Sequence, residues 1–155
     1  LYGSKHTISV YERMMLVKIK QIMTTEVSSV TPEDTVTKAA SIMEQLNVGS
    51  VPVTDNKRVV GIVTDRDIVL RGVAKGKDAN QKVSDVMSTD IKYATPDMDV
   101  HKAADIMAEN QVRRLPVVDS DTLVGIVAIG DLAVENIFEN EAGEALHNIS
   151  MGVRH

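Results

Sequence analysis

The chain has 155 residues, 43% hydrophobic and 25% charged, so it can bury a core and is not disordered throughout. Its net charge of -5 and near lack of aromatic residues (one Phe, three Tyr, no Trp) argue against nucleic-acid binding as its main activity. The absence of cysteine excludes disulfides, thiolate metal sites and a cysteine nucleophile; no apolar run approaches the ~18 to 20 residues of a membrane helix, so we expect a soluble cytoplasmic protein.

The first 14 residues show no clear hydrophobic period and do not begin with methionine. We interpret residues 1–15 as an N-terminal extension or a remnant of cloning, with the native start near Met14 or Met15. A strand around residues 7–11 is the alternative.

From residue 19 onward the sequence is a duplication. Residues 61–67 (GIVTDRD) return as residues 125–131 (GIVAIGD), an offset of 64 residues (125 minus 61), and residues 19–70 align with residues 83–134 without a gap. Two copies at so long a period are typical of a pair of small domains packed together, not of a solenoid.

Each copy predicts the order strand, helix, strand, strand, helix. In the first copy, residues 27–30 form a short strand that Pro32 ends, and Asp34 and Thr35 can cap the helix that follows. The apolar face expected for this helix and its counterpart is formed by Val36, Ala39, Ala40, Met43 and Leu46 in the first copy and Val100, Ala103, Ala104 and Met107 in the second.

The second half of each copy predicts a hairpin and a helix. Residues 50–53 and 59–63 are β-branched runs joined by a turn at residues 55–57. Asp67 opens the last helix of the first copy, and Asp131 opens its counterpart. Residues 72–82 have the composition of a linker, and the apolar residues between residue 132 and Ile149 predict an extended amphipathic helix with a glutamate-rich outer side.

The doubled pattern of Met-Thr-x-x-Val, Thr-Pro, Ala-Ala-x-Ile-Met, Val-Pro-Val-x-Asp and Gly-Ile-Val-Thr-Asp-Arg-Asp resembles a tandem pair of CBS domains, or Bateman module. The resemblance implies an α/β (α+β) fold of two βαββα domains about a pseudo-twofold axis. The expected divisions are a first domain (16–72), a linker (73–82), a second domain (83–140) and a helix end and tail (141–155).

The resemblance also implies a function. Such modules are regulatory and non-catalytic, and they bind AMP, ADP, ATP or S-adenosylmethionine in clefts between the two domains. The expected partners are therefore an adenosyl ligand, a second copy in a homodimer and an unknown effector protein, with neither nucleic acid nor membrane. No catalytic cofactor is expected.

In that family the motif Gly-x-x-Thr/Ser-x-x-Asp serves the ribose and phosphates. It matches Gly61, Thr64 and Asp67 here, while the second copy has Gly125 and Asp131 with alanine in the hydroxyl position. A carboxylate at a helix start can accept hydrogen bonds from both hydroxyls of a ribose, and the amides and dipole of the helix can face a phosphate. Asp67 and Asp131 are thus the ribose candidates; the alternative is that each is only a helix N-cap.

The phosphate candidates are Thr64, Arg66, Arg113 and Arg114. Because Ala128 cannot donate a hydrogen bond, the second site should bind phosphate more weakly, bind a nucleoside-like ligand, or use the arginines as donors. Those arginines could equally be solvated charges or part of an interface ion pair.

An adenine ring needs apolar walls, and the resemblance assigns these by position to Val30, Val51, Pro52, Val53, Ala94, Leu115, Pro116 and Val117. Most of them would be core residues even if nothing bound. The four histidines have no metal-ligand spacing, so we expect no metal site, and no P-loop, Rossmann fingerprint or Ser-His-Asp set indicates an enzyme. The alternative function is a structural dimerisation module whose clefts are degenerate and empty.

Overall fold

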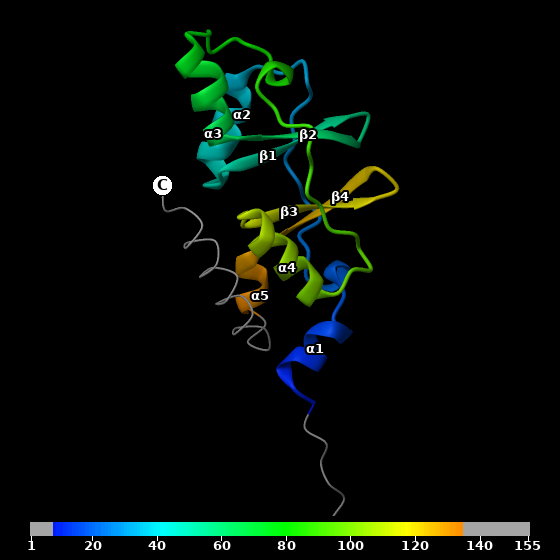
Figure 1. Cartoon of the computed structure of the whole chain (residues 1–155). Helices are drawn as coiled ribbons and strands as arrows, with labels where there is room; N and C mark the ends of the chain where they lie inside the picture. Colours follow the sequence, from blue (N-terminus) through cyan, green and yellow to red (C-terminus); the bar gives the residue numbers. More distant parts are fainter. Residues whose placement is uncertain (1–7, 135–155) are drawn as a thin grey trace, which may run out of the picture. The chain divides into compact units, whose positions relative to one another are not determined.

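A computed structural model describes residues 8–134 (Figure 1). Its contacts divide the chain into two compact units. Unit 1 contains the described residues up to Thr24, Ala94–Val117 and those from Ile126 onward; unit 2 contains Thr25–Tyr93 and Val118–Gly125. The predictions for residues 1–7 and for the helix and tail beyond residue 134 lie outside the described residues.

In unit 2, helix α2 (Val36–Leu46) packs on a β-hairpin. Thr35 is its N-cap, with a side chain that accepts a hydrogen bond from the Lys38 amide. Val36, Ala39 and Met43 are buried in the core, as predicted. Two other residues of the predicted face, Ala40 and Leu46, are exposed, because the hairpin covers a narrower stripe of the helix than the apolar pattern suggested.

The hairpin consists of β1 (Ser50–Asp55) and β2 (Arg58–Thr64), paired antiparallel (Figure 1). Its turn residues Asn56 and Lys57 both have positive φ, 50° and 70°, as expected for a tight hairpin turn. Arg58 also pairs with Thr122 of β4 (Thr122–Ala128), and with β3 at Arg114–Asp119 the strand order is β1-β2-β4-β3. The prediction of a mixed fold with a strand hairpin in this copy is confirmed.

The strand predicted over residues 27–30 is wrong in extent, because only Val30 forms a bridge, parallel to Val53. The Val30 amide donates to the Pro52 carbonyl at 3.0 Å, and the Thr54 amide donates to the Val30 carbonyl at 2.8 Å. The next parallel pair on either side would need an amide from Pro52 or from Pro32. Proline has none, so the ladder stops after one residue.

In unit 1, helix α4 (Val100–Asn110) starts at the N-cap Asp99, which accepts a hydrogen bond from the Lys102 amide at 2.8 Å. All four predicted apolar positions of this helix are buried: Val100, Ala103, Ala104 and Met107. It is followed by β3 (Arg114–Asp119), whose Val117 bridges Ala94 just as Val53 bridges Val30. After β4 the chain enters α5 (Ile129–Val134).

Helix α1 (Val10–Leu16) precedes the first copy and belongs to unit 1. Ser9 and Glu12 form a reciprocal capping box at its start, with both hydrogen bonds at 3.1 Å, so the alternative of a strand at residues 7–11 is wrong. Met14 is only 1% exposed. The Tyr11 and His101 rings contact each other in an edge-to-face arrangement at a centroid distance of 4.7 Å, and His101 of α4 is half-buried.

The first residues of each copy pair with the other copy. In unit 1 the Ile19 amide donates to the Met98 carbonyl at 2.9 Å. In unit 2 the Val83 amide donates to the Asp34 carbonyl at 2.8 Å, which is the same bond shifted by 64 residues at both ends. Both donors are fully buried. This pairing of the start of each copy with the other copy, called the exchange below, therefore repeats at the 64-residue offset of the sequence.

The segment predicted as a linker packs against α2 before this exchange begins. It contains a 3₁₀ turn at Val73–Lys75, and the Thr37 hydroxyl donates to the Ala79 carbonyl at 2.8 Å.

Candidate functional site

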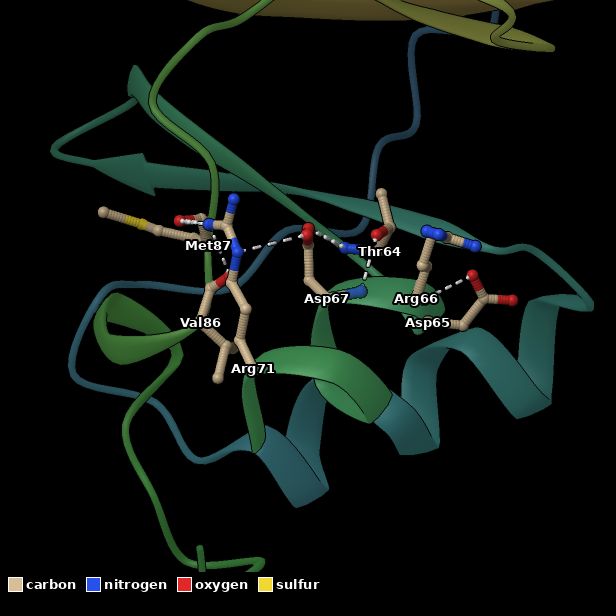
Figure 2. Close-up of polar contacts among 7 residues, drawn as sticks. All are labelled: Thr64, Asp65, Arg66, Asp67, Arg71, Val86 and Met87. Atoms are coloured by element: carbon tan, nitrogen blue, oxygen red, sulfur yellow. Dashed lines mark hydrogen bonds and ion pairs between the residues drawn. The ribbon is translucent and has the colours of Figure 1, made fainter. Parts of the chain in front are cut away.

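The first motif lies at the corner where β2 ends and the short helix α3 (Asp65–Asp67) begins, before a π-helical turn at Ile68–Gly72. The Asp67 amide donates to the Thr64 hydroxyl oxygen at 3.0 Å, and the Thr64 amide donates to Asp67 Oδ2 at 3.0 Å (Figure 2). Thr64 is thus the N-cap, and Asp67 is the third helical residue of a capping box. The prediction that Asp67 opens the helix is wrong by two residues.

The amides of this helix start already have acceptors. The Asp65 amide donates to the Gly49 carbonyl at 3.0 Å, the Arg66 amide to the Asp65 side chain at 2.8 Å, and the Ile68 amide to the Asp65 carbonyl. Together with the Asp67 amide, these bonds occupy the donors that the sequence analysis assigned to a phosphate. A phosphate here would have to be held by side chains.

Two side chains of the first motif have hydrogen-bonding capacity left. The Thr64 hydroxyl accepts from Asp67 but keeps its own O–H as a donor. Arg66 is exposed and, within the described part of the chain, forms no ion pair. Thr64 contacts Asp67 directly, and Arg66 is its neighbour in sequence; these three residues are the candidates for a charged sugar phosphate.

Asp67 has a further neighbour that the sequence analysis did not assign to the site. Its Oδ1 lies 3.9 Å from Arg71 Nε, and Arg71 Nη1 donates to the carbonyls of Val86 (3.3 Å) and Met87 (3.1 Å) (Figure 2). The sequence signal for this contact was the spacing of four residues between an acid and an arginine on one helix. The arginine is half exposed, whereas the Asp67 side chain is only 16% exposed.

Gly61 has a packing role. A Cβ at this position would lie 2.8 Å from Met87 Sδ and 2.9 Å from the Ser88 carbonyl oxygen. Ser88 pairs with Ile62 along β2, so a glycine is required for this close approach. Gly125 of the second motif is also buried.

The second motif repeats half of this geometry. The Ala128 amide donates to Asp131 Oδ2 at 2.8 Å, and the Ile129 amide donates to the Arg113 carbonyl at 2.9 Å, as the Asp65 amide does to Gly49. With alanine at position 128, there is no hydroxyl oxygen to accept a hydrogen bond from the Asp131 amide. Asp131 is the third residue of α5, so the prediction that it opens this helix is wrong by two residues. Arg113 is exposed and Arg114 half-buried, and neither forms an ion pair within residues 8–134.

The adenine candidates fall into two groups of core residues. All eight are buried: Val30, Val51, Pro52 and Val53 in unit 2 and Ala94, Leu115, Pro116 and Val117 in unit 1. Their packing matches the alternative stated for them, a core role that needs no ligand. Their contact with adenine stays a prediction.

A separate hollow of about 380 Å³ lies over the outer side of α2. It contains neither Thr64 nor Asp67. Its lining residues are Val36, Thr37, Ala40, Ser41, Glu44, Ile68, Val73, Lys77, Asp78 and Ala79.

The pKa perturbations lie away from the motif. The Thr31 backbone amide lowers the pKa of Asp34, more than burial raises it. The Lys20 ammonium lowers the pKa of Asp97 at 2.9 Å, and Glu33 raises the pKa of Lys82 at 2.7 Å. Asp97 and Glu33 are 64 residues apart, so both ion pairs fasten the exchanged start of one copy to the other.

Residues 8–134 contain no group of three or more His, Cys, Asp or Glu side chains that could hold a metal ion. None of the helices in the same part of the chain has the length and apolarity required to cross a membrane.

The comparisons with known proteins agree with the duplicated geometry. The family model for the CBS domain matches residues 19–73 and 83–135. The CBS domain-containing protein YhcV of Bacillus subtilis (strain 168) is 49% identical over 132 residues, which cover 85% of this chain and 94% of that protein.

Two solved CBS-domain structures resemble this one, each with a TM-score of 0.68 and 25% identity. The CBS domain pair of protein MJ0100, in complex with 5-methylthioadenosine and S-adenosyl-L-methionine, matches over 81% of this chain and 98% of its own. CBSX2 in complex with AMP matches over 79% and 98%. The family-model matches to both copies, together with the 49% identical relative, show that the chain belongs to the CBS-domain family, as a tandem pair of CBS domains.

Proposed function

We propose that the protein is a non-catalytic regulatory module that binds an adenosyl ligand, such as AMP, ADP, ATP or S-adenosylmethionine. The observation that carries the proposal is that one carboxylate oxygen of Asp67 still has hydrogen-bonding capacity. Asp67 uses Oδ2 in the capping box, while among the described residues Oδ1 has only Arg71 as a partner, at 3.9 Å. The complexes of MJ0100 and CBSX2 with adenosyl compounds support this class of ligand.

Asp67 Oδ1 accepts the hydrogen bonds of the ribose hydroxyls in this proposal. The carboxylate is largely shielded from water, which strengthens such bonds. The Thr64 hydroxyl and the Arg66 guanidinium receive the phosphate, because the amides of the helix start are occupied.

The second motif is the weaker phosphate site. Asp131 remains a ribose acceptor, and Arg113 and Arg114 replace the missing hydroxyl of residue 128. A nucleoside-like ligand, without phosphates, fits this motif better than ATP does.

Signalling requires that the ligand bind two states of the protein with different affinity. We propose that a second copy of the chain takes part in this change. Unit 2 exposes four large apolar residues, each at least 45% accessible, on α2 and on the turns after α3: Leu46, Val69, Leu70 and Val73. Val69 and Leu70 lie in the π-helical turn after α3 and Val73 lies in the 3₁₀ turn that follows it, and burial of exposed apolar residues of this kind favours association. The effector protein that reads the change would be a further partner.

The test is a calorimetric titration of AMP, ADP, ATP and S-adenosylmethionine against wild type and two matched variants. Asp67→Asn keeps the hydrogen bond from the Thr64 amide but removes the charge, and we expect at least about tenfold weaker binding. Asp65→Asn, at an exposed neighbour whose side chain accepts a hydrogen bond from the next amide, should leave the affinity within about twofold. Equal affinity of all three proteins, or no binding of any of the four compounds, would refute the proposal.

The alternative, a structural dimerisation module with empty clefts, is favoured by the occupied amides and by the buried adenine candidates. A ligand at 100 times its Kd stabilises its target by about 2.7 kcal/mol, whereas a scaffold shows no shift in unfolding temperature with any adenosyl compound. Sedimentation of Val73→Glu tests the association face, since the charge should convert a dimer to a monomer in either case.

A further inference from the structure

We infer that Arg71 is a positioning residue that couples the carboxylate of Asp67 to the main chain at Val86 and Met87. Its guanidinium lies between the two groups, with Nε 3.9 Å from Asp67 Oδ1 and Nη1 3.3 and 3.1 Å from the two carbonyls (Figure 2). One side chain thus contacts the candidate ribose acceptor and the start of the second sequence copy. The ligand-dependent part of the inference rests on the proposed function.

The segment that Arg71 holds is tightly fixed at its other contacts. Val86 is fully buried, and Ser88 exchanges two hydrogen bonds with Ile62 of β2, at 2.8 and 2.9 Å. The Met87 side chain lies against Gly61. Movement of the Arg71 guanidinium therefore acts on a segment that has little freedom to absorb it locally.

A ligand bound to Asp67 would weaken the electrostatic attraction between Asp67 and Arg71. Hydrogen bonds from ribose hydroxyls spread the negative charge of the carboxylate and occupy Oδ1, so the attraction between Asp67 and Arg71 falls. The guanidinium is half exposed and can shift toward the two carbonyls or toward water. Either shift alters the hydrogen bonds to Val86 and Met87.

The coupling through Arg71 is specific to the first copy. The residue 64 positions after Arg71 is Glu135, and a carboxylate cannot donate to a carbonyl. The first copy thus combines the hydroxyl of Thr64 with this arginine, and the second copy has neither. Occupation of the first motif should be transmitted, and occupation of the second should not use this route.

A double-mutant cycle tests the coupling without any ligand. Amide hydrogen exchange at Met87 and Ser88 is measured in wild type, Asp67→Asn, Arg71→Gln and the double variant. We expect Asp67→Asn to change exchange at these amides by about threefold or more in wild type, and by less than about 1.5-fold when residue 71 is glutamine. Equal factors in both backgrounds would overturn the inference. Asp65→Asn is the control, and it should leave both amides unchanged.

A second arm adds AMP to wild type and to Arg71→Gln. We expect AMP to alter exchange at Met87 and Ser88 in wild type and to bind the variant without that alteration. The same alteration in both proteins would overturn the inference while leaving the proposed function standing.

If AMP does not bind, the proposed function loses AMP as its ligand, and the ligand-free cycle still decides the coupling. Arg71→Lys keeps the charge but not the planar fork, so it should lose the coupling too, and it replaces the glutamine variant if that variant does not fold.

Discussion

The substitution Gly61→Ala tests whether the motif glycine is required for packing. The added Cβ would lie 2.8 Å from Met87 Sδ and 2.9 Å from the Ser88 carbonyl oxygen. The methionine side chain can move away, but the carbonyl is main chain and accepts the Ile62 amide at 2.9 Å, so the segment itself must shift. Overpacking costs about 1 to 3 kcal/mol and each loosened hydrogen bond about 0.5 to 1.5, so we expect a loss of about 2 to 4 kcal/mol.

Urea unfolding, followed by circular dichroism, measures this change in the free energy of unfolding. Gly130→Ala is the matched control, because its Cβ meets nothing within 4 Å and residue 130 lies in α5. We expect it to be stabilising by about 0.4 to 1 kcal/mol. If the free energy of unfolding of Gly61→Ala is within about 0.5 kcal/mol of wild type, the structure accommodates the added Cβ without destabilisation and the packing role is refuted.

Three further predictions concern the helices and the loop before α2. Met14→Ala should cost about 2 to 4 kcal/mol, because this side chain fastens α1 to its unit, whereas the 48% exposed Met15 should tolerate the same change within about 0.5; urea midpoints of the two variants decide. Thr35→Ala removes the N-cap of α2 and should cost about 1 kcal/mol in the same assay. The Thr31 amide lowers the pKa of Asp34 in the folded state, so its contribution to stability is present above the ordinary aspartate pKa and is lost as the pH falls through the lowered value; Asp34→Asn should weaken the acid dependence of the urea midpoint, and an unchanged dependence would contradict this.

The two copies differ most at the residues that would respond to a ligand. Both motifs keep the bond from the backbone at position 64 or 128 to the aspartate three residues later. Within residues 8–134, only the first adds the hydroxyl of Thr64 and the arginine contact of Asp67. The hydrogen bond from the backbone amide to the aspartate is common to both copies, so a capping role for the aspartates does not exclude ligand contact. The hydroxyl of Thr64 and the Arg71 contact distinguish the first copy and are the features to test for a function there.

Several features of the protein follow from local sequence alone. The hairpin turn residue Asn56 and the apolar face of α4 were predicted correctly, because turn chemistry and helical period act over a few neighbouring residues. The repeat offset of 64 predicted two similar sets of elements, and the family match confirmed a pair of CBS domains. The single-residue ladder at Val30 could also have been derived, since Pro32 and Pro52 cannot donate to a parallel neighbour.

Other features depend on contacts between residues far apart in the chain, which a local pattern does not encode. Tertiary contacts decided that Ile19 and Val83 each pair with the other copy, and that Gly61 must admit the Ser88 carbonyl. They also decided that the amides of α3 are occupied, one of them by the Gly49 carbonyl, and that Arg71 reaches past Asp67 to two carbonyls. Propensity and period describe how a residue sits on its own helix or strand, whereas these partners are brought together only when separate segments pack.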